Sequence, residues 1–212
     1  MRMKIISVVV ATTAVGLLAT GCGGEGSGSG DAGAKPAPVG AVLPQKLTEP
    51  PALPEDELQP SQADDATFGE NLAYELRRKT LNMARAAGKV TSTCPKGLEP
   101  KGGSKVTCTT TYEGLEVEWD VTVGDKPGWS DNMVEFEAVP RQGILTRDGV
   151  ARLLYGNSGD TMDYALCNGI PKAVLVPLNA KSKYSCEVVF KGKDPVGAAT
   201  AVRVTAAGPR VF

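Results

Sequence analysis

The stretch SKVTCTTTYEGLEVEWDVTV at residues 104–123 gives the strongest fold signal in this chain of 212 residues. Its second part, from Leu115 to Val123, alternates strictly between apolar side chains and charged or hydroxyl side chains. The first part alternates less strictly, and the dipeptide Glu113-Gly114 between the two parts is typical of a tight turn. This pattern predicts an antiparallel hairpin with one buried face and one face in water.

A helix is expected before this hairpin and a third strand after it. Thr67 and Glu70 have the spacing of a capping box, and apolar residues then recur at helical spacing until Gly88, where the helix is expected to stop. After a loop at residues 125–132, apolar residues alternate again at residues 134–138. One helix followed by an antiparallel meander is an α+β unit.

The same pattern recurs later in the chain. Residues 104–114 align without a gap to residues 182–192, with identical Ser, Lys, Cys and Gly at four positions. A shorter helix is expected from Thr146, upstream of the second copy. We therefore predict an α+β fold built as a tandem repeat of a helix packed on an antiparallel sheet, with repeats at 63–140 and 141–212. Chance similarity between two strand–turn segments is the alternative.

Four of the five cysteines, Cys94, Cys108, Cys167 and Cys186, lie in the region expected to fold. An even number in an exported chain predicts two disulfides, for which three pairings exist. The repeat favours Cys94–Cys108 and Cys167–Cys186, one local disulfide in each copy. A zinc site is the weaker alternative, because the spacings are long and the chain contains no histidine.

The N-terminus has the features of an export signal. Two basic residues precede an uncharged run at residues 5–19, which is too short to span a bilayer comfortably. The end of this run, Ala19-Thr-Gly-Cys22, resembles a lipobox, so residues 1–21 are predicted to be cleaved and Cys22 to be lipidated. An ordinary secretory signal with an incidental cysteine is the alternative.

A Gly/Ser stretch and a proline-rich stretch follow, and both are poor in apolar residues. Residues 22–62 are therefore predicted to form a lipidated, disordered tether that holds the folded part away from the membrane. Loss of residues 1–21 removes two positive charges and changes the net charge from −1 to −3. This balance predicts no nucleic-acid partner and assigns membrane attachment to the lipid.

The absence of histidine argues against most catalytic machinery near neutral pH. No cofactor and no metal site are expected, and the chain is predicted not to be an enzyme. The alternative is an enzyme or a calcium site that uses the carboxylates Glu113, Glu116, Glu118 and Asp120. Alternation explains the last three as the solvent face of a strand.

Two aromatic residues are candidates for binding a partner. Trp129 lies in a loop rich in Gly, Pro and Asp, and such a tryptophan is typical of a binding anchor or of a plug at the end of a core. Tyr155 is a weaker candidate of the same kind. The three consecutive basic residues at positions 77–79 are interpreted as a solvated helix face, with anion binding as the alternative.

The pattern Val90-Thr-Ser-Thr-Cys-Pro95, a glycine-containing gap, then Val106-Thr-Cys-Thr and an alternating strand resembles a domain of unknown function of actinobacterial lipoproteins. The resemblance covers about residues 66–124 and implies a cell-surface setting, but it transfers no functional residues. The second copy departs from the pattern at Asn168, where the proline would stand. The expected architecture is also similar to that of the β-lactamase inhibitory proteins, which points to the sheet surface and the strand-joining loops.

Together these patterns predict a lipid-anchored, non-enzymatic protein on the extracytoplasmic face of the cell membrane. Its expected partner is an envelope or secreted protein or another envelope component. Two alternatives are a carboxylate-dependent envelope enzyme that acts on glycans and a structural spacer without a specific ligand.

Overall fold

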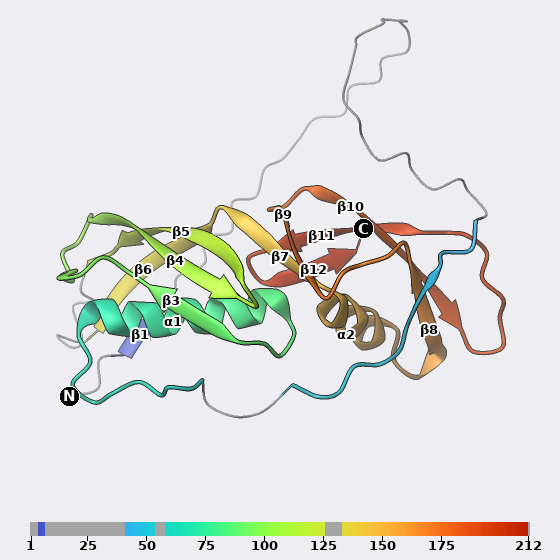
Figure 1. Cartoon of the computed structure of the whole chain (residues 1–212), viewed down its shortest axis with the longest axis horizontal. Helices are drawn as coiled ribbons and strands as arrows, with labels where there is room; N and C mark the ends of the chain where they lie inside the picture. Colours follow the sequence, from blue (N-terminus) through green and yellow to red (C-terminus); the bar gives the residue numbers. More distant parts are fainter. Residues whose placement is uncertain (1–3, 7–40, 54–57, 126–132, 212) are drawn as a thin grey trace, which may run out of the picture.

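The structure, a computed structural model, describes residues 4–6, 41–53, 58–125 and 133–211. Within them the fold is α+β, with mostly antiparallel strands (Figure 1). The elements are β1 (Lys4–Ile6), β2 (Gln45–Leu47), α1 (Phe68–Ala84), β3 (Val90–Thr93), β4 (Lys105–Tyr112), β5 (Leu115–Val123), β6 (Met133–Pro140), β7 (Gln142–Thr146), α2 (Arg147–Ser158), η1 (Gly159–Thr161), β8 (Met162–Cys167), β9 (Ala173–Pro177), β10 (Lys181–Phe190), β11 (Thr200–Thr205) and β12 (Gly208–Val211).

The first sheet has the strand order β1-β6-β5-β4-β3, and α1 covers one of its faces. The predicted hairpin is β4–β5, which pairs from Lys105 with Thr122 to Tyr112 with Leu115. The alternating side chains of β5 divide as expected. Val117, Trp119, Val121 and Val123 are buried, and Glu116, Glu118 and Asp120 are exposed.

Helix α1 begins as predicted and ends earlier than predicted. Thr67 and Glu70 form the capping box, with the Glu70 carboxylate 2.7 Å from the Thr67 backbone nitrogen. The helix ends at Ala84, and Arg85 takes the left-handed conformation at its C-cap. Gly88 was expected to end the helix, but it makes room for an aromatic ring: a Cβ there would lie 2.6 Å from the ring of Tyr112.

The second sheet has the order β12-β11-β10-β8-β2, and a separate ribbon pairs β7 with β9. Helix α2 begins after Thr146, as the sequence predicts, and the Thr146 hydroxyl accepts from the Gly149 amide at 2.9 Å. In each half, a helix precedes four antiparallel strands that follow one another in the sheet: β3, β4, β5 and β6 in the first half (63–140), and β8, β10, β11 and β12 in the second half (141–212).

Both favoured disulfides, Cys94–Cys108 and Cys167–Cys186, are formed. Cys167 and Cys186 are directly opposite in β8 and β10, whereas Cys94 directly follows β3, next to the last pair of the β3–β4 ladder, Thr93 with Thr109. The Cα atoms are 4.4 and 4.2 Å apart, the spacing of non-hydrogen-bonded pairs. Each disulfide therefore fixes the first two strands of its sheet.

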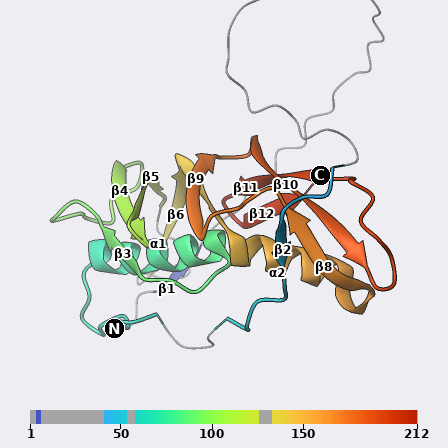
Figure 2. The same ribbon diagram turned by 45° about the vertical axis from the view of Figure 1, so that its right-hand side comes forward.

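The two halves share one hydrophobic core, which extends from α1 through β7 to β11. Figures 1 and 2 show α1 and α2 following one another along the long axis of the molecule. At their junction the Thr146 hydroxyl donates to the carbonyl of Ala84, the last residue of α1, at 2.6 Å. The C-terminal end of one helix thus meets the N-terminal cap of the next.

The prediction of a disordered tether through residue 62 is wrong for its later part. Leu43 and Leu47 are buried, and β2 pairs antiparallel with β8 as the outer strand of the second sheet. The chain then runs along the molecule to α1, as Figures 1 and 2 show. We call residues 41–53 and 58–66 the strap.

Within the described part of the chain, no helix is long and apolar enough to cross a membrane. Strand β1 lies parallel to β6, at the edge of the first sheet and inside the predicted signal peptide. The predicted lipidation site Cys22 and the candidate anchor Trp129 lie outside the described residues.

Candidate functional site

The strap is fixed at both ends by hydrogen bonds to the folded body. At its start, the Gln45 side chain donates to the Ile170 carbonyl at 2.9 Å and accepts from the Ile170 amide at 2.7 Å. At its far end, the Arg77 guanidinium donates to the carbonyls of Gln59 and Pro60, each at 3.0 Å. Between these ends, Arg152 donates to the carbonyl of Pro51.

A groove of about 1040 Å³ lies between the strap, helix α1 and strand β3. Strap residues from Leu58 to Ala66 form one wall, and one side of α1 forms the second. The third wall is the connection from α1 to β3 and the strand itself. The apolar lining of the whole groove includes Leu53, Leu58, Ala73, Leu81, Ala86 and Val90. A groove of this size and composition has the character of a binding site.

Strand β3 brings a free sheet edge into this groove, since it is the outermost strand of its sheet. The Glu113 amide donates to the Lys89 carbonyl at 3.0 Å, so Lys89 and Glu113 form a hydrogen-bonded pair. In an antiparallel ladder such pairs alternate with pairs whose backbone groups point outward. The N–H and C=O groups of Val90 and Ser92 therefore point away from β4, and both residues line the groove.

The Ser92 hydroxyl is a second polar group without a partner at this edge. Its oxygen is buried and has no hydrogen-bond partner among the described residues. Buried hydroxyls are nearly always hydrogen-bonded, because an unmade bond costs about 1–3 kcal/mol. The edge of β3 thus combines open backbone donors and acceptors with an unsatisfied side chain.

Charged side chains stand around the groove. Arg77, Arg78, Lys89 and Glu70 all contribute to its lining. The Arg78 guanidinium pairs with Glu75 at 2.6 Å, and Glu70 is occupied by the capping box. Hydrogen bonds from Thr67 lower the pKa of Glu70, so this carboxylate stays ionised. The rim carries more positive than negative charge.

The basic residues at positions 77–79 do not form one solvated helix face. Arg77 holds the strap, while the half-buried Lys79 lies with its ammonium 5.6 Å from the centre of the Phe136 ring. Burial lowers the pKa of Lys79.

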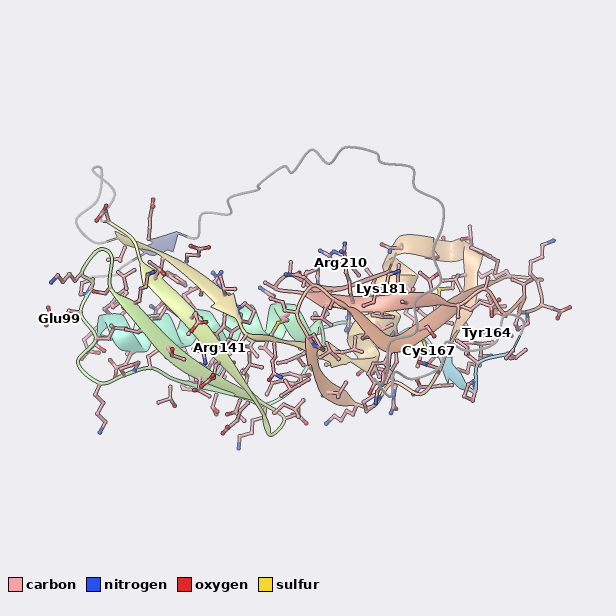
Figure 3. The ribbon with its side chains drawn as sticks, turned by 90° about the horizontal axis from the view of Figure 1, so that it is seen from above. Glu99, Arg141, Tyr164, Cys167, Lys181 and Arg210 are labelled. Carbon is pink, nitrogen blue, oxygen red and sulfur yellow. A yellow bond between two sulfur atoms is a disulfide. The ribbon has the colours of Figure 1, made fainter. Side chains whose placement is uncertain are left out.

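The carboxylates singled out from the sequence lie at the turn and on the open face of the first sheet, and cations neutralise three of them. Arg141, which Figure 3 labels, forms salt bridges with Glu118 and Asp120. Lys172 forms a salt bridge with Glu113 at 2.6 Å. The hydrogen bond from Arg141 lowers the pKa of Asp120, and the bond from Lys172 lowers that of Glu113. A general acid needs a raised pKa.

Tyr155 lies on α2 and does not line the groove. Its ring packs against the core, and its hydroxyl donates to the Asp163 carbonyl at 3.1 Å. Burial raises the pKa of Tyr155. These contacts join the last turn of α2 to strand β8, and binding of a partner by Tyr155 stays a prediction. Trp129 lies outside the described residues.

No cluster of His, Cys, Asp and Glu that could hold a metal ion occurs among the residues that the structure describes. Sequence reasoning missed the groove because its outer wall belongs to the stretch predicted to be disordered. The available signal was weak: Leu43 and Leu47 are separated by polar residues within a proline-rich segment.

Comparison of the chain with protein-family models, curated proteins and solved structures finds no match. The resemblance to the lipoprotein domain of unknown function therefore stays a prediction, and function has to be argued from the groove.

Proposed function

We propose that this chain is a lipid-anchored cell-envelope protein, attached through Cys22, that binds an extended segment of a partner protein in the groove. The segment adds as a strand to the free edge of β3. The observation that carries this proposal is the outward-facing backbone of Val90 and Ser92 inside an apolar groove. Strand addition satisfies such groups by main-chain hydrogen bonds, while side-chain pockets supply specificity.

Three features support a peptide over a small apolar ligand. An apolar ligand would leave the outward backbone groups of Val90 and Ser92 unpaired, which is costly inside a groove. The positive rim would favour acidic side chains in the partner segment. The strap is held by hydrogen bonds to carbonyls at Gln59 and Pro60, so the outer wall is defined before a partner arrives.

We also propose that the two halves are copies of one ancestral unit. The support is the shared order of a helix and four meandering strands, with a disulfide between the first two strands of each sheet. The groove belongs to the first copy, because the equivalent outer edge of β8 is covered by β2 of the strap. The duplication thus yields one open edge and one closed edge.

The carboxylate-dependent enzyme is disfavoured by the ion pairs of Glu113, Glu118 and Asp120 and by the lowered pKa values of Glu113 and Asp120. A spacer without a ligand would not need an apolar groove beside an open strand edge.

The test is photo-crosslinking in cells that produce the full-length protein. A photoreactive amino acid replaces Thr91, which lines the groove, or Thr107, an exposed residue of β4 outside it. Each is combined with Ser92→Pro or with Ser92→Ala. Proline removes the outward N–H but no bond to β4, because the amide of Ser92 faces the groove. Alanine removes only the hydroxyl.

We expect one protein to crosslink at Thr91 and none at Thr107. Ser92→Pro should reduce the crosslink roughly tenfold, since losing one hydrogen bond of about 1–1.5 kcal/mol has that effect on binding. Ser92→Ala should retain most of it. Equal crosslinking at both positions, or no response to Ser92→Pro, would contradict strand addition.

Mass spectrometry of the mature N-terminus tests lipidation, and Cys22→Ser should release the protein from membranes.

A further inference from the structure

The place where the chain enters the folded body sets which end of the molecule lies nearest its anchor. Residues 41–47 lie against the second sheet, where Leu43 is buried against Leu166 and Val189. Figure 3 places Tyr164 and Cys167 of β8 at this end, and Cys167 pairs with Gln45 of β2. A lipid on Cys22 is therefore connected to the folded body at this end of the molecule. This step rests on the lipidated Cys22 of the proposed function.

The length of the connecting chain keeps this end close to the membrane. Only the 19 residues 22–40 separate the lipidation site from the start of the strap. Fully extended, they reach at most about 65 Å. As a Gly-rich coil, which their composition predicts, they would span about 25 Å on average. A tether through residue 62 would have a fully extended length more than twice as long.

The same end presents exposed apolar side chains. Val42, Phe190 and Val196 are 62 %, 50 % and 75 % exposed, and they are three of the five large exposed hydrophobic residues in the described chain. Figures 1 and 2 show the start of the strap and the loop after β10 at this end of the molecule. Phe190 and Val196 also border a hollow of about 580 Å³.

The loop that carries Val196 is held in place by a buried carboxylate. Glu187 is 3 % exposed and accepts hydrogen bonds from the backbone amides of Val196 at 2.6 Å and Gly197 at 3.0 Å. This contact takes the place of strand pairing, because β10 pairs with β11 only as far as Cys186. An apolar side chain is thereby fixed in an outward position.

Charges of both signs surround these residues. Lys191 and Lys193 are exposed near Phe190, and the Lys191 amide donates to the Thr161 carbonyl at 3.0 Å, which places Asp160 close by. Asp194 follows in the same loop, and Lys46 lies over the ring of Tyr164 at 3.8 Å. The named groups sum to only one positive charge, so apolar contact, more than attraction to anionic lipid, would hold this surface at the membrane.

We infer that Val42, Phe190 and Val196 form a membrane-facing surface that lies against the interfacial region of the bilayer. The lipid holds the body near the membrane, and these apolar side chains fix its orientation. With the second half against the membrane, the groove lies in the half of the molecule that is farther from the bilayer, where a partner can reach it. An aromatic side chain with flanking lysines suits the interface, where rings and long basic side chains are accommodated.

The test uses the lipidated mature protein, purified from membranes and reconstituted into phosphatidylcholine vesicles with or without brominated acyl chains. Tryptophan reporters are introduced as Phe190→Trp and, in a second variant, Val196→Trp. The control is Val139→Trp in β6 of the first sheet, where Val139 is 47 % exposed. The emission of the parent protein is subtracted in each case.

Brominated lipid should roughly halve the added emission of Phe190→Trp and Val196→Trp and leave Val139→Trp unchanged, because the quencher reaches only side chains at the interface. Equal quenching of all three, or none at Phe190→Trp while the protein stays on the vesicles, overturns this inference and leaves the lipid anchor intact. Protein that washes off the vesicles overturns the anchor and this inference together.

Discussion

The junction of the two helices makes one glycine indispensable. Gly149 lies in the first turn of α2, and a Cβ there would lie 2.3 Å from the Ala84 carbonyl oxygen and 2.6 Å from Thr146 Oγ1. The Thr146 hydroxyl already donates a hydrogen bond to the Ala84 carbonyl oxygen at 2.6 Å. The backbone of α1 therefore has to move before an alanine fits.

The cost of Gly149→Ala follows from these distances. Ordinary contacts begin near 3.4 Å, so the two helices must separate by about 1 Å. Overpacking of this kind costs about 1–3 kcal/mol, and weakening the buried hydroxyl bonds adds about 1 kcal/mol. The better helix propensity of alanine returns less than about 1 kcal/mol. We expect a net loss of about 2 kcal/mol, which for a domain of this size lowers Tm by roughly 4–8 °C.

Thermal and urea unfolding of the oxidised protein, followed by circular dichroism, measure this change. Gly156→Ala is the matched control: it lies in the same helix, and its Cβ would meet nothing within 4 Å. That variant should be neutral or stabilised by up to about 1 kcal/mol. If Gly149→Ala stays within about 0.5 kcal/mol of the parent, the close approach of the helices is not what joins the halves.

Three further predictions concern the core. Burial raises the pKa of Tyr112 from 10 to about 12, so the neutral phenol stabilises the fold fully below pH 10, and this contribution of about 2–3 kcal/mol is lost as pH rises to 12. Urea unfolding measured against pH should show this loss of stability, and Tyr112→Phe should abolish the part that comes from Tyr112. Thr110→Val leaves the Trp119 indole N–H, now bonded at 2.9 Å, without an acceptor and should cost about 1–3 kcal/mol, and a loss below about 0.5 kcal/mol would contradict this. Replacing both Cys94 and Cys108 by alanine should lower the free energy of unfolding by about 3 kcal/mol, measured with urea, because their separation of 14 closes a short loop; unchanged stability would exclude a stabilising role.

Local features of the fold were readable from the sequence because their causes are local. The capping box of Thr67 and Glu70 marks the start of α1, and the alternation in β5 separates buried from exposed residues. The expected repeat favoured the disulfide pairing that the structure forms, because each half of the sequence contains two of the four cysteines. The end of α1 was misplaced, since Gly88 is required by the distant ring of Tyr112 and not by a helix terminus.

The candidate site was not predictable in the same way. Its free edge exists because no strand among the described residues pairs with β3 on the side away from β4. Its outer wall exists because Arg77 holds the carbonyls of Gln59 and Pro60. The composition of the strap predicts disorder, because its few apolar residues could not form a core alone. Leu43 and Leu47 are buried only because the second sheet offers them a surface.

The sequence by itself thus determined the α+β class, the β4–β5 hairpin and the helix starts, and it favoured the two disulfides that the structure forms. These depend on periodicity, capping and spacing within short windows of the chain. Tertiary structure alone decided how the halves join through Gly149, where the strap lies and which strand edge is left open. Those outcomes depend on contacts between residues far apart in sequence, whose free energies no local pattern contains.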